Sequence, residues 1–178
     1  MTNRAKTAKD NRRRGLATET RVAKLFDGVK VPMSGAGGIK GDVIIPKSYF
    51  GSIFVEVKNK SERKGDVPVA IISLATLTKM EQQSATFNHV GAFLFFHYHN
   101  IVRGDYCIMN YPDFTSFAQR RSIRIDVKES YSEKKRFIIP LFMVQPLQHS
   151  TDACMIWTVQ DKVYAVCHAS TMRRILLP

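Results

Sequence analysis

Two apolar runs that lie close together in the chain constrain most strongly what it can fold into. Residues 41–46 and 52–58 are rich in β-branched residues and are bounded by turn residues, which predicts two short β-strands. Side chains on a strand alternate between its faces, and the odd-numbered positions of the second run are all apolar. One face of this strand is therefore complete without Glu56 and Lys58, which are left side by side at the strand end.

The acidic residue that opens the first run extends this pair into a possible catalytic set. Asp42 begins the first predicted strand and lies close in sequence to Glu56 and Lys58. Two acids bind a hard divalent cation through their oxygens, and a neighbouring lysine can hold a water or an anionic transition state. These three side chains, two carboxylates and one ammonium group, are the smallest set of functional groups needed for metal-dependent hydrolysis of a phosphodiester bond.

A third acid precedes these strands on a predicted helix. Residues 12–27 have helical apolar periodicity, and Gly28 is expected to end the helix. Glu19 lies within the apolar stripe rather than opposite it, where an unpaired carboxylate is costly. It either pairs with Arg21 or Lys24 at the edge of the stripe, or reaches a metal site from the helix.

The spacing of these residues resembles a known signature. Asp42, a gap to the next strand and then Glu56-x-Lys58 are similar to the acid…acid-x-Lys pattern of the PD-(D/E)XK nuclease superfamily. Gly41 stands where the name-giving proline would be, a departure that many members share.

Within this superfamily, the order of motifs resembles the archaeal-type Holliday junction resolvases and their viral relatives. In that family a basic segment precedes a helix glutamate, followed by a serine in a flexible loop, the aspartate and Glu-x-Lys. Glu19 and Ser34 match the first two of these over roughly residues 10–100. Met33 replaces the arginine that usually precedes the serine, so Lys30 or Lys40 would have to supply its charge. Ser34 is otherwise a polar turn residue in a glycine-rich loop.

The resemblance implies an α/β fold of the restriction-endonuclease type, with a central mixed β-sheet flanked by helices and a β-rich C-terminal extension. It implies Mg²⁺, or Mn²⁺ in its place, held by Asp42, Glu56 and the Val57 carbonyl. Glu19 would assist a second ion or a water on the metal, and Lys58 would orient the attacking water or offset transition-state charge. The implied catalytic residues are Glu19, Ser34, Asp42, Glu56 and Lys58.

The charge of the chain indicates an acidic partner. The 27 Lys and Arg residues exceed the 15 Asp and Glu residues, which gives a net charge of +12 and a pI of about 9.8, the usual footprint of a nucleic-acid binder. The excess concentrates in residues 1–14, interpreted as a flexible arm that lies along phosphates rather than a solubilising tail. The expected DNA-binding residues are Arg4, Lys6, Lys9, Arg12, Arg13, Arg14, Lys30, Lys40, Lys60, Arg63 and Lys64.

Length and cysteine content bound the organisation and location of the protein. Residues 15–178 are expected to form one nuclease domain, with a core of about residues 15–100 and an extension of about residues 101–178. The longest apolar runs have strand length, so no membrane-spanning helix is expected. Three cysteines without a C-x-x-C pair favour a reduced, cytoplasmic setting. The expected location is therefore inside the cell in association with DNA, and the cell can also be the host of a virus that encodes the protein.

The rest of the chain predicts further elements. After the acidic strand pair we expect an apolar segment at 69–72, a helix at 73–88 and a buried strand at 91–96. The extension is expected to contain strands at 103–110, 122–127, 136–144, 153–159 and 162–167, with helices at 112–120 and 170–176. It would complete the sheet, cover an edge strand or build a subunit interface.

The sequence thus predicts a structure-selective DNA endonuclease, with Holliday junction resolution in DNA recombination and repair as the leading assignment. Such resolvases act as homodimers, because two matched nicks need two sites related by a two-fold axis. One alternative is another DNA endonuclease of the superfamily, of the restriction, repair or replication type. A second is a non-catalytic DNA- or RNA-binding protein, against which the intact acid set argues.

Overall fold

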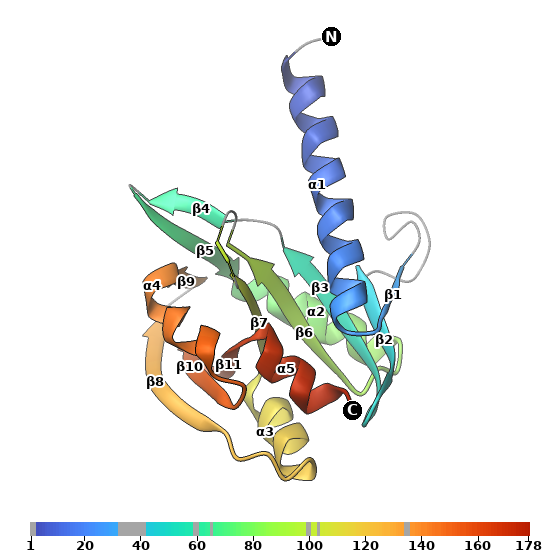
Figure 1. Ribbon diagram of the computed structural model, residues 1–178, viewed down its shortest axis with the longest axis vertical. Coiled ribbons are helices and arrows are strands. Elements are labelled where there is room, and N and C mark those ends of the chain that lie inside the picture. The colour runs from blue at the N-terminus through green and yellow to red at the C-terminus, as the bar shows by residue number, and fades with distance from the viewer. Residues whose placement is uncertain are drawn as a thin grey trace.

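The computed structural model describes residues 3–31, 42–58, 61–64, 66–98, 101–102, 104–133 and 136–178 of the chain. Helices and strands are mixed along the sequence (Figure 1). In chain order they are α1 (Asn3–Leu25), β1 (Val29–Lys30), β2 (Val43–Ser48), β3 (Gly51–Lys58), β4 (Ser61–Lys64), β5 (Val67–Ser73), α2 (Leu74–Thr86), β6 (Gly91–His97), β7 (Asp105–Asn110), α3 (Tyr111–Arg120), β8 (Asp126–Glu133), β9 (Arg136–Pro140), α4 (Leu141–Val144), the 3₁₀ helix η1 (Gln145–His149), β10 (Ala153–Val159), β11 (Lys162–His168) and α5 (Ala169–Leu176).

Most strands belong to one large mixed sheet. Its eight strands have the order β1-β2-β3-β6-β7-β11-β10-β8, and a second sheet has the order β4-β5-β9. Strand β3 is parallel to β6, and β8 is parallel to β10, while the other neighbours in the large sheet are antiparallel. The expected mixed α/β architecture, with a central sheet flanked by helices, is confirmed.

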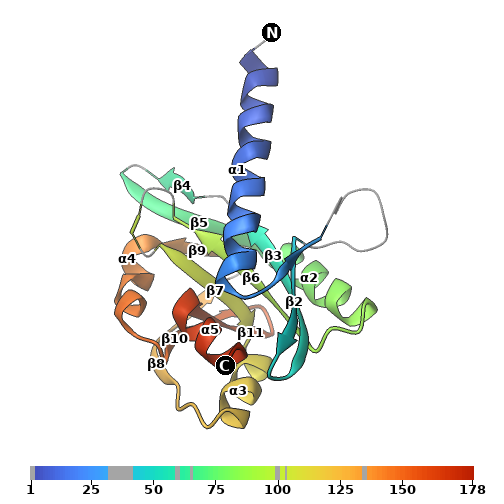
Figure 2. The same cartoon turned by 45° about the vertical axis from the view of Figure 1, so that its right-hand side comes forward.

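Apolar side chains fill a separate core on each face of the large sheet. One core contains the buried residues of α1, α3 and α5, and the other contains those of α2, η1 and the small sheet. Figures 1 and 2 show these two groups of elements on opposite sides of the central strands. Strand β6 is covered on both faces, which explains why its sequence is a continuous apolar run.

Helix α1 is longer than the periodicity predicted. It begins at Asn3 rather than near residue 12, so the segment interpreted as a basic arm forms the first half of the helix, which projects from the sheets in Figures 1 and 2. The chain leaves the helix at Asp27, whose φ of 50° takes the left-handed conformation expected for Gly28. The Gly28 N–H then donates to the Ala23 carbonyl at 2.8 Å.

The elements that follow the acidic strand pair agree with the sequence patterns. Helix α2 is capped by Ser73, whose Oγ accepts from the Thr76 N–H at 3.2 Å. The apolar segment at 69–72 belongs to strand β5, and the strand predicted at 103–110 is β7, antiparallel to β6. Helices α3 and α5 lie close to their predicted bounds.

The C-terminal extension completes the large sheet. Strands β11 and β10 lie at their predicted positions and form a hairpin, and β11 pairs with β7. One predicted strand is misplaced, and another is shorter than predicted. Ile123 and Ile125 suggested a strand at 122–127, but they pack on the core from the connection before β8, which is an exposed, polar edge strand. The strand predicted at 136–144 ends at Pro140, after which the chain turns into α4.

The three cysteines lie side by side in the large sheet. Cys167 of β11 is the register partner of both Cys107 on β7 and Cys154 on β10. All three are buried, free thiols. Burial raises the pKa of each thiol, that of Cys154 to about 12.

In the part of the chain that the structure describes, no helix is long and apolar enough to cross a membrane.

Gly28 provides a test of how tightly α1 is joined to the sheet. A Cβ atom at Gly28 would lie 2.8 Å from Val43 Cγ1 and 2.9 Å from the Ile44 carbonyl oxygen. We expect Gly28→Ala to lower the free energy of unfolding by about 1–3 kcal/mol, because the backbone must shift. At Gly15 nothing lies within 4 Å of an added Cβ, so Gly15→Ala should raise stability by up to about 1 kcal/mol. Urea unfolding gives the free energy of unfolding of both variants and of wild type. An unchanged stability of Gly28→Ala would contradict the predicted close contact between Gly28 and strand β2.

Candidate active site

The register of the β2–β3 hairpin brings the two predicted metal-binding acids together. Val43 pairs with Val55, and just before this pair the Asp42 N–H donates to the Val55 carbonyl at 3.2 Å, which brings Asp42 to the end of β3 that carries Glu56. Val43 and Val55 are fully buried, as is Ile45 opposite Ile53. A slip by one residue would expose these side chains, so the core fixes the position of the acids.

Asp42 is held by a backbone hydrogen bond and is electrostatically strained. Its Oδ2 accepts from the Val57 N–H at 2.7 Å. Burial and the neighbouring Glu56 raise the pKa of Asp42 to about 6, with a smaller contribution from Glu19. The Val57 N–H and Lys58 lower this pKa but only partly offset the increase. A cation beside Asp42 would relieve this strain.

Glu56 and Lys58 form an ion pair on the same face of β3. Lys58 Nζ contacts Glu56 Oε1, and the two side chains are 37% and 20% exposed, respectively. Val57, between them, packs on the core of the opposite face. The predicted division of this strand into an apolar face and a face with the two charged residues is therefore confirmed. The pair lies at the carboxyl end of β3.

Glu19 approaches this site from α1. The buried side chains of the helix include Thr18, Val22 and Phe26, and Glu19 is half-buried at the border of this stripe. It lies near enough to raise the pKa of Asp42. Arg21, one of the two suggested partners of Glu19, makes an ion pair with Asp105 at 2.7 Å. Glu19 thus lies near Asp42, but the prediction that it joins Asp42 and Glu56 as a metal ligand is not met, because these three described acids do not form a group that could hold a metal ion.

Among the described residues, two carboxylates are available as ligands for a cation, and they do not form a complete protein ligand set. No group of three or more His, Cys, Asp or Glu side chains that could hold a metal ion exists among them. Asp42 and Glu56 each have one oxygen engaged, by Val57 N–H and Lys58, which leaves one oxygen of each free of these contacts. Two carboxylate oxygens and a backbone carbonyl suit Mg²⁺, which keeps several waters in protein sites.

The remaining predicted site residues are only partly described. Ser34, Lys40 and Lys60 lie outside the described residues. Lys30, in β1, donates from Nζ to Thr20 Oγ1 at 3.2 Å. Of the basic residues on α1 and β4, the structure describes exposed side chains for Arg12, Arg13 and Arg14, and the backbone alone for Arg4, Lys6, Lys9, Arg63 and Lys64.

A second polar cluster, which the sequence did not predict, lies at the same end of the sheet. Asp105, at the start of β7, contacts His97 Nδ1 at 2.6 Å and Arg21 of α1 at 2.7 Å. Burial raises the pKa of Asp105, but the His97 hydrogen bond and Arg21 outweigh it and hold that pKa below its usual value. Because β6 is parallel to β3, His97 lies one residue beyond the partner of Lys58. Arg21 and Asp105 are 84 residues apart, so no local pattern could have revealed their contact.

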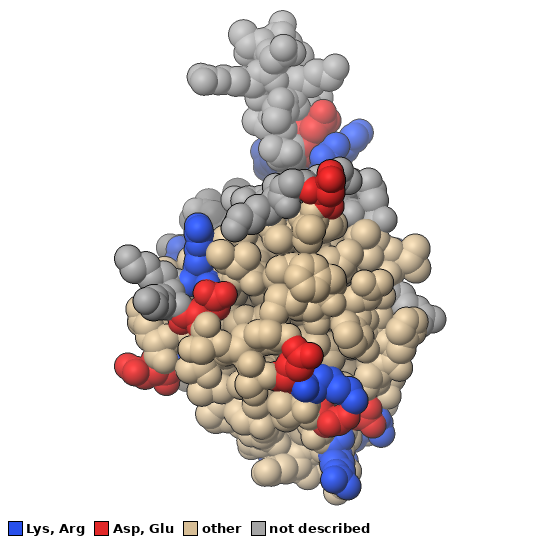
Figure 3. Space-filling view, turned by 90° about the vertical axis from the view of Figure 1, so that its left-hand side faces the viewer, with Lys and Arg blue, Asp and Glu red and all other residues tan. Residues whose placement is uncertain are grey.

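The positive charge does not spread over the whole surface. Figure 3 shows a face on which acidic and basic side chains are interspersed and most of the described surface is uncharged. The exposed arginines 12–14 belong to the projecting part of α1.

The raised pKa of Asp42 predicts a pH-dependent effect of its replacement. The carboxyl binds its proton more tightly in the folded chain, with a pKa of about 6 against an ordinary value of 3.8. The wild-type protein should therefore lose stability as pH rises from about 4 to about 6, and stay at that level above. In metal-free buffer, Asp42→Asn should be more stable than wild type at pH 7 by on the order of 2 kcal/mol, and equal to it near pH 4. Thermal unfolding at pH 4 and pH 7 measures the stability difference between Asp42→Asn and wild type. The same difference at both pH values would contradict the prediction.

No protein-family model matches the sequence, and neither a curated protein nor a solved structure matches it.

Proposed function

We propose that this chain is a Mg²⁺-dependent DNA endonuclease whose substrate is a four-way junction. The observation that carries the proposal is the Asp42 carboxyl, largely removed from water beside the carboxyl end of β3. Its pKa is raised to about 6 by burial and by the neighbouring Glu56, and Lys58 forms an ion pair with that glutamate. A group with a perturbed pKa beside further charged groups is characteristic of catalytic sites.

Each side chain has a role in hydrolysis on this proposal. Asp42, Glu56 and the Val57 carbonyl would hold the metal, and Glu19 would support it from α1. A bound Mg²⁺ supplies Lewis-acid polarisation of the scissile phosphate. Lys58 would orient the attacking water or offset the charge that develops on the phosphate. Its contact with Glu56 keeps the ammonium group at the site before DNA arrives.

The order and pairing of the elements support a PD-(D/E)XK-type core. Helix α1 is followed by β1 and the β2–β3 hairpin, then by β4 and β5 of the small sheet, α2 and β6, and β6 is parallel to β3. Apart from β1, β4 and β5, this succession of helix, strands, helix and strand is that of the nuclease core that the motifs resemble. The acids lie on the hairpin and on α1, where the resemblance places them.

The choice of a four-way junction rests on the resemblance of motif order to the archaeal-type Holliday junction resolvases. On this proposal the protein acts as a homodimer, with two active sites related by a two-fold axis that nick opposite strands. Mn²⁺ would substitute for Mg²⁺. The basic residues of α1 would contact phosphates without reading sequence, since such contacts position a protein on DNA.

A second candidate is another DNA endonuclease of the same superfamily. It is favoured by the C-terminal strands β11, β10 and β8, which extend the sheet beyond the part of the chain that resembles the resolvases. Folds of this kind support different substrates through such additions.

A panel of DNA substrates tests the proposal and separates its alternatives. With Mg²⁺, the wild-type protein should nick a four-way junction faster than duplex, flap or single-stranded DNA. Glu56→Gln should lower the rate roughly 10²–10³-fold while junction binding persists, because one charge stabilising the site is lost. Ca²⁺ should support binding without turnover. Glu129→Gln, at an exposed position of β8, is the matched control and should retain full activity.

Each other result on this panel has a definite meaning. Cleavage of plain duplex at a short sequence would favour a restriction-like enzyme. Binding without cleavage of any substrate would favour a non-catalytic nucleic-acid-binding protein. Near-normal activity of Glu56→Gln would show that the site is wrongly assigned.

Glu19 distinguishes catalytic from structural roles for acids on α1. Glu19→Gln should strongly reduce cleavage but change stability little, because the charge of this half-buried side chain acts on Asp42, whose pKa it raises. An edge ion pair would give the reverse, with normal turnover and a stability loss of about 0.3–0.5 kcal/mol. Comparing the cleavage rate with the melting temperature of this variant separates the two roles.

A further inference from the structure

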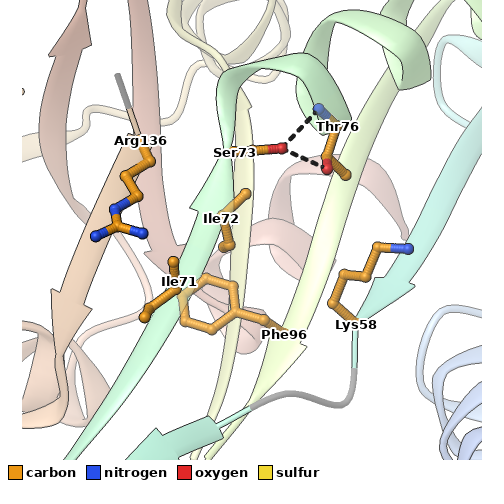
Figure 4. A pocket seen from close by; sticks show the side chains of 7 residues that line it. All are labelled: Lys58, Ile71, Ile72, Ser73, Thr76, Phe96 and Arg136. Carbon is orange, nitrogen blue, oxygen red and sulfur yellow. Dashed lines mark hydrogen bonds between the residues drawn. The ribbon is translucent and has the colours of Figure 1, made fainter. Parts of the chain in front are cut away.

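A cavity with two cationic side chains in its wall lies beside the proposed active site. Its volume is about 450 Å³, within the range of about 300–1,000 Å³ found for small-molecule sites. Figure 4 shows Lys58 on one side of it and Arg136 on the other, with Ser73 and Thr76 at one end. None of the described residues that line it is acidic. Lys58 belongs both to the candidate active site and to this wall, so whatever binds here lies next to the proposed chemistry.

Arg136 is better placed than Lys58 to bind an anion in this cavity. The ammonium group of Lys58 forms an ion pair with Glu56, whereas Arg136 is exposed and has no ion pair in the described part of the chain. The strand that carries Arg136 is anchored in the core, because Phe137 and Ile139 of β9 are fully buried. A planar guanidinium can donate two parallel hydrogen bonds to one phosphate group.

Two hydroxyl groups add a further donor at one end of the cavity. Ser73, the register partner of Arg136 in the small sheet, caps helix α2, and its Oγ accepts from the Thr76 N–H at 3.2 Å. The hydroxyl oxygens of Ser73 and Thr76 lie 2.8 Å apart, and this hydrogen bond uses one of their two protons. The other proton is available to an anion. The pairing of β5 with β9 thus brings an arginine and a hydroxyl donor to the same cavity.

The apolar part of the wall indicates what kind of anion fits. Ile72 and Phe96 are buried core residues that expose almost no surface, so the half-buried Ile71 provides most of this part. An inorganic ion would leave most of the volume empty and make no use of the isoleucine. A phosphate joined to a sugar matches the wall better, because the sugar carbons can contact Ile71 while the phosphate oxygens accept from Arg136.

From these contacts we infer that the cavity binds the sugar–phosphate backbone of the DNA at the phosphate next to the bond that is cut. Lys58 contacts the reacting phosphate, and Arg136 with the hydroxyl donor binds its neighbour along the strand. The backbone lies on the outside of paired DNA, so this contact needs no unpaired nucleotide and is compatible with a fully paired four-way junction. The inference rests on the proposed nuclease function, and it makes Arg136, in the C-terminal extension, a residue that positions the substrate.

The salt dependence of binding tests the Arg136 contact separately from catalysis. The full-length protein is titrated in EDTA against a fluorescein-labelled four-way junction at several salt concentrations, and fluorescence anisotropy gives the affinities. Arg136→Gln should make the slope of log affinity against log salt shallower by about 0.9, the value for one lost phosphate contact. The matched control is Arg124→Gln, which loses the same charge at an exposed position between α3 and β8 and should keep the wild-type slope.

Thr76 allows a substitution that opposes an anion without disturbing the fold. It lies in the first turn of α2, where a negative charge is favourable. Thr76→Glu should therefore keep or raise the melting temperature, yet weaken junction binding at least as much as Arg136→Gln does, because it places a carboxylate in the cavity. Thr76→Gln has the same size without the charge, and it should bind the junction with close to the wild-type affinity.

A neutral linkage in the DNA identifies the phosphate that the cavity binds. Cleavage in Mg²⁺ gives the position of the cut, and junctions are then made with one uncharged methylphosphonate at single positions near it. At a phosphate next to the cut, the affinity ratio of wild type to Arg136→Gln should fall close to one, because both partners of the same contact are then removed. At more distant positions the ratio should stay at its value for unmodified DNA.

The outcomes separate this inference from the proposed function. An unchanged slope for Arg136→Gln, or equal binding by Thr76→Glu and Thr76→Gln, would overturn the cavity as a backbone site even if the protein cleaves junctions. A ratio that stays high with methylphosphonate on either side of the cut would overturn its position beside the cut bond.

Inorganic phosphate separates DNA from a free anion as the source of the phosphate group. If it raises the wild-type melting temperature more than chloride does at equal ionic strength, and Arg136→Gln keeps the wild-type slope with DNA, the cavity binds a free anion and the inference fails. In a protein that cleaves no DNA in Mg²⁺, a shallower slope for Arg136→Gln and weaker binding by Thr76→Glu would support the backbone contact and overturn the nuclease proposal.

Discussion

The register of strand β3 between β2 and β6 is the constraint on which the candidate site depends. Ile53 and Val55 fill one core, and Phe54 fills the other, so β3 cannot shift without exposing side chains on both faces. The same register brings Asp42 to the carboxyl end of β3, where it accepts from the Val57 N–H, and places Lys58 beside Phe96 of β6. Apolar residues that take no part in chemistry thus determine the geometry of the charged ones.

Two acids at this end of the sheet are in opposite electrostatic environments. Asp42 has two further acids near it and is largely removed from water, which raises its pKa. Asp105, at the same end of the sheet, has His97 and Arg21 as partners, and its pKa is lowered. Lys58, the cation near Asp42, forms its ion pair with Glu56 and only partly offsets the rise. Acids that a fold keeps in this state are candidates for function rather than for stability.

Much of this arrangement could be predicted from the sequence, because the signals were local. Alternation of side chains predicted the hairpin and the two faces of β3, and a continuous apolar run predicted that β6 is buried on both sides. Helix periodicity identified the second half of α1 and placed Glu19 within its apolar stripe, whereas the structure has this side chain half-buried at the border of that stripe.

The remaining features depend on contacts between distant segments. The Arg21–Asp105 ion pair joins residues 84 positions apart, and the pairing of β5 with β9 brings Arg136 to the wall of the cavity. The polar strand β8 has no apolar alternation, because it lies at an exposed sheet edge and buries few side chains. Ile123 and Ile125 have the alternation typical of a strand, but they pack on the core from the connection before β8. Such features are set by tertiary packing and leave no pattern within a short window of sequence.

The row of cysteines across β7, β11 and β10 has a practical consequence. Their thiols are buried, and their raised pKa values keep them in the unreactive protonated form while the chain is folded. A cysteine introduced at the surface can therefore be labelled selectively without replacing the native ones. The three native cysteines lie on adjacent strands, so they become accessible when these strands separate. Their alkylation rate therefore measures how often this part of the sheet opens.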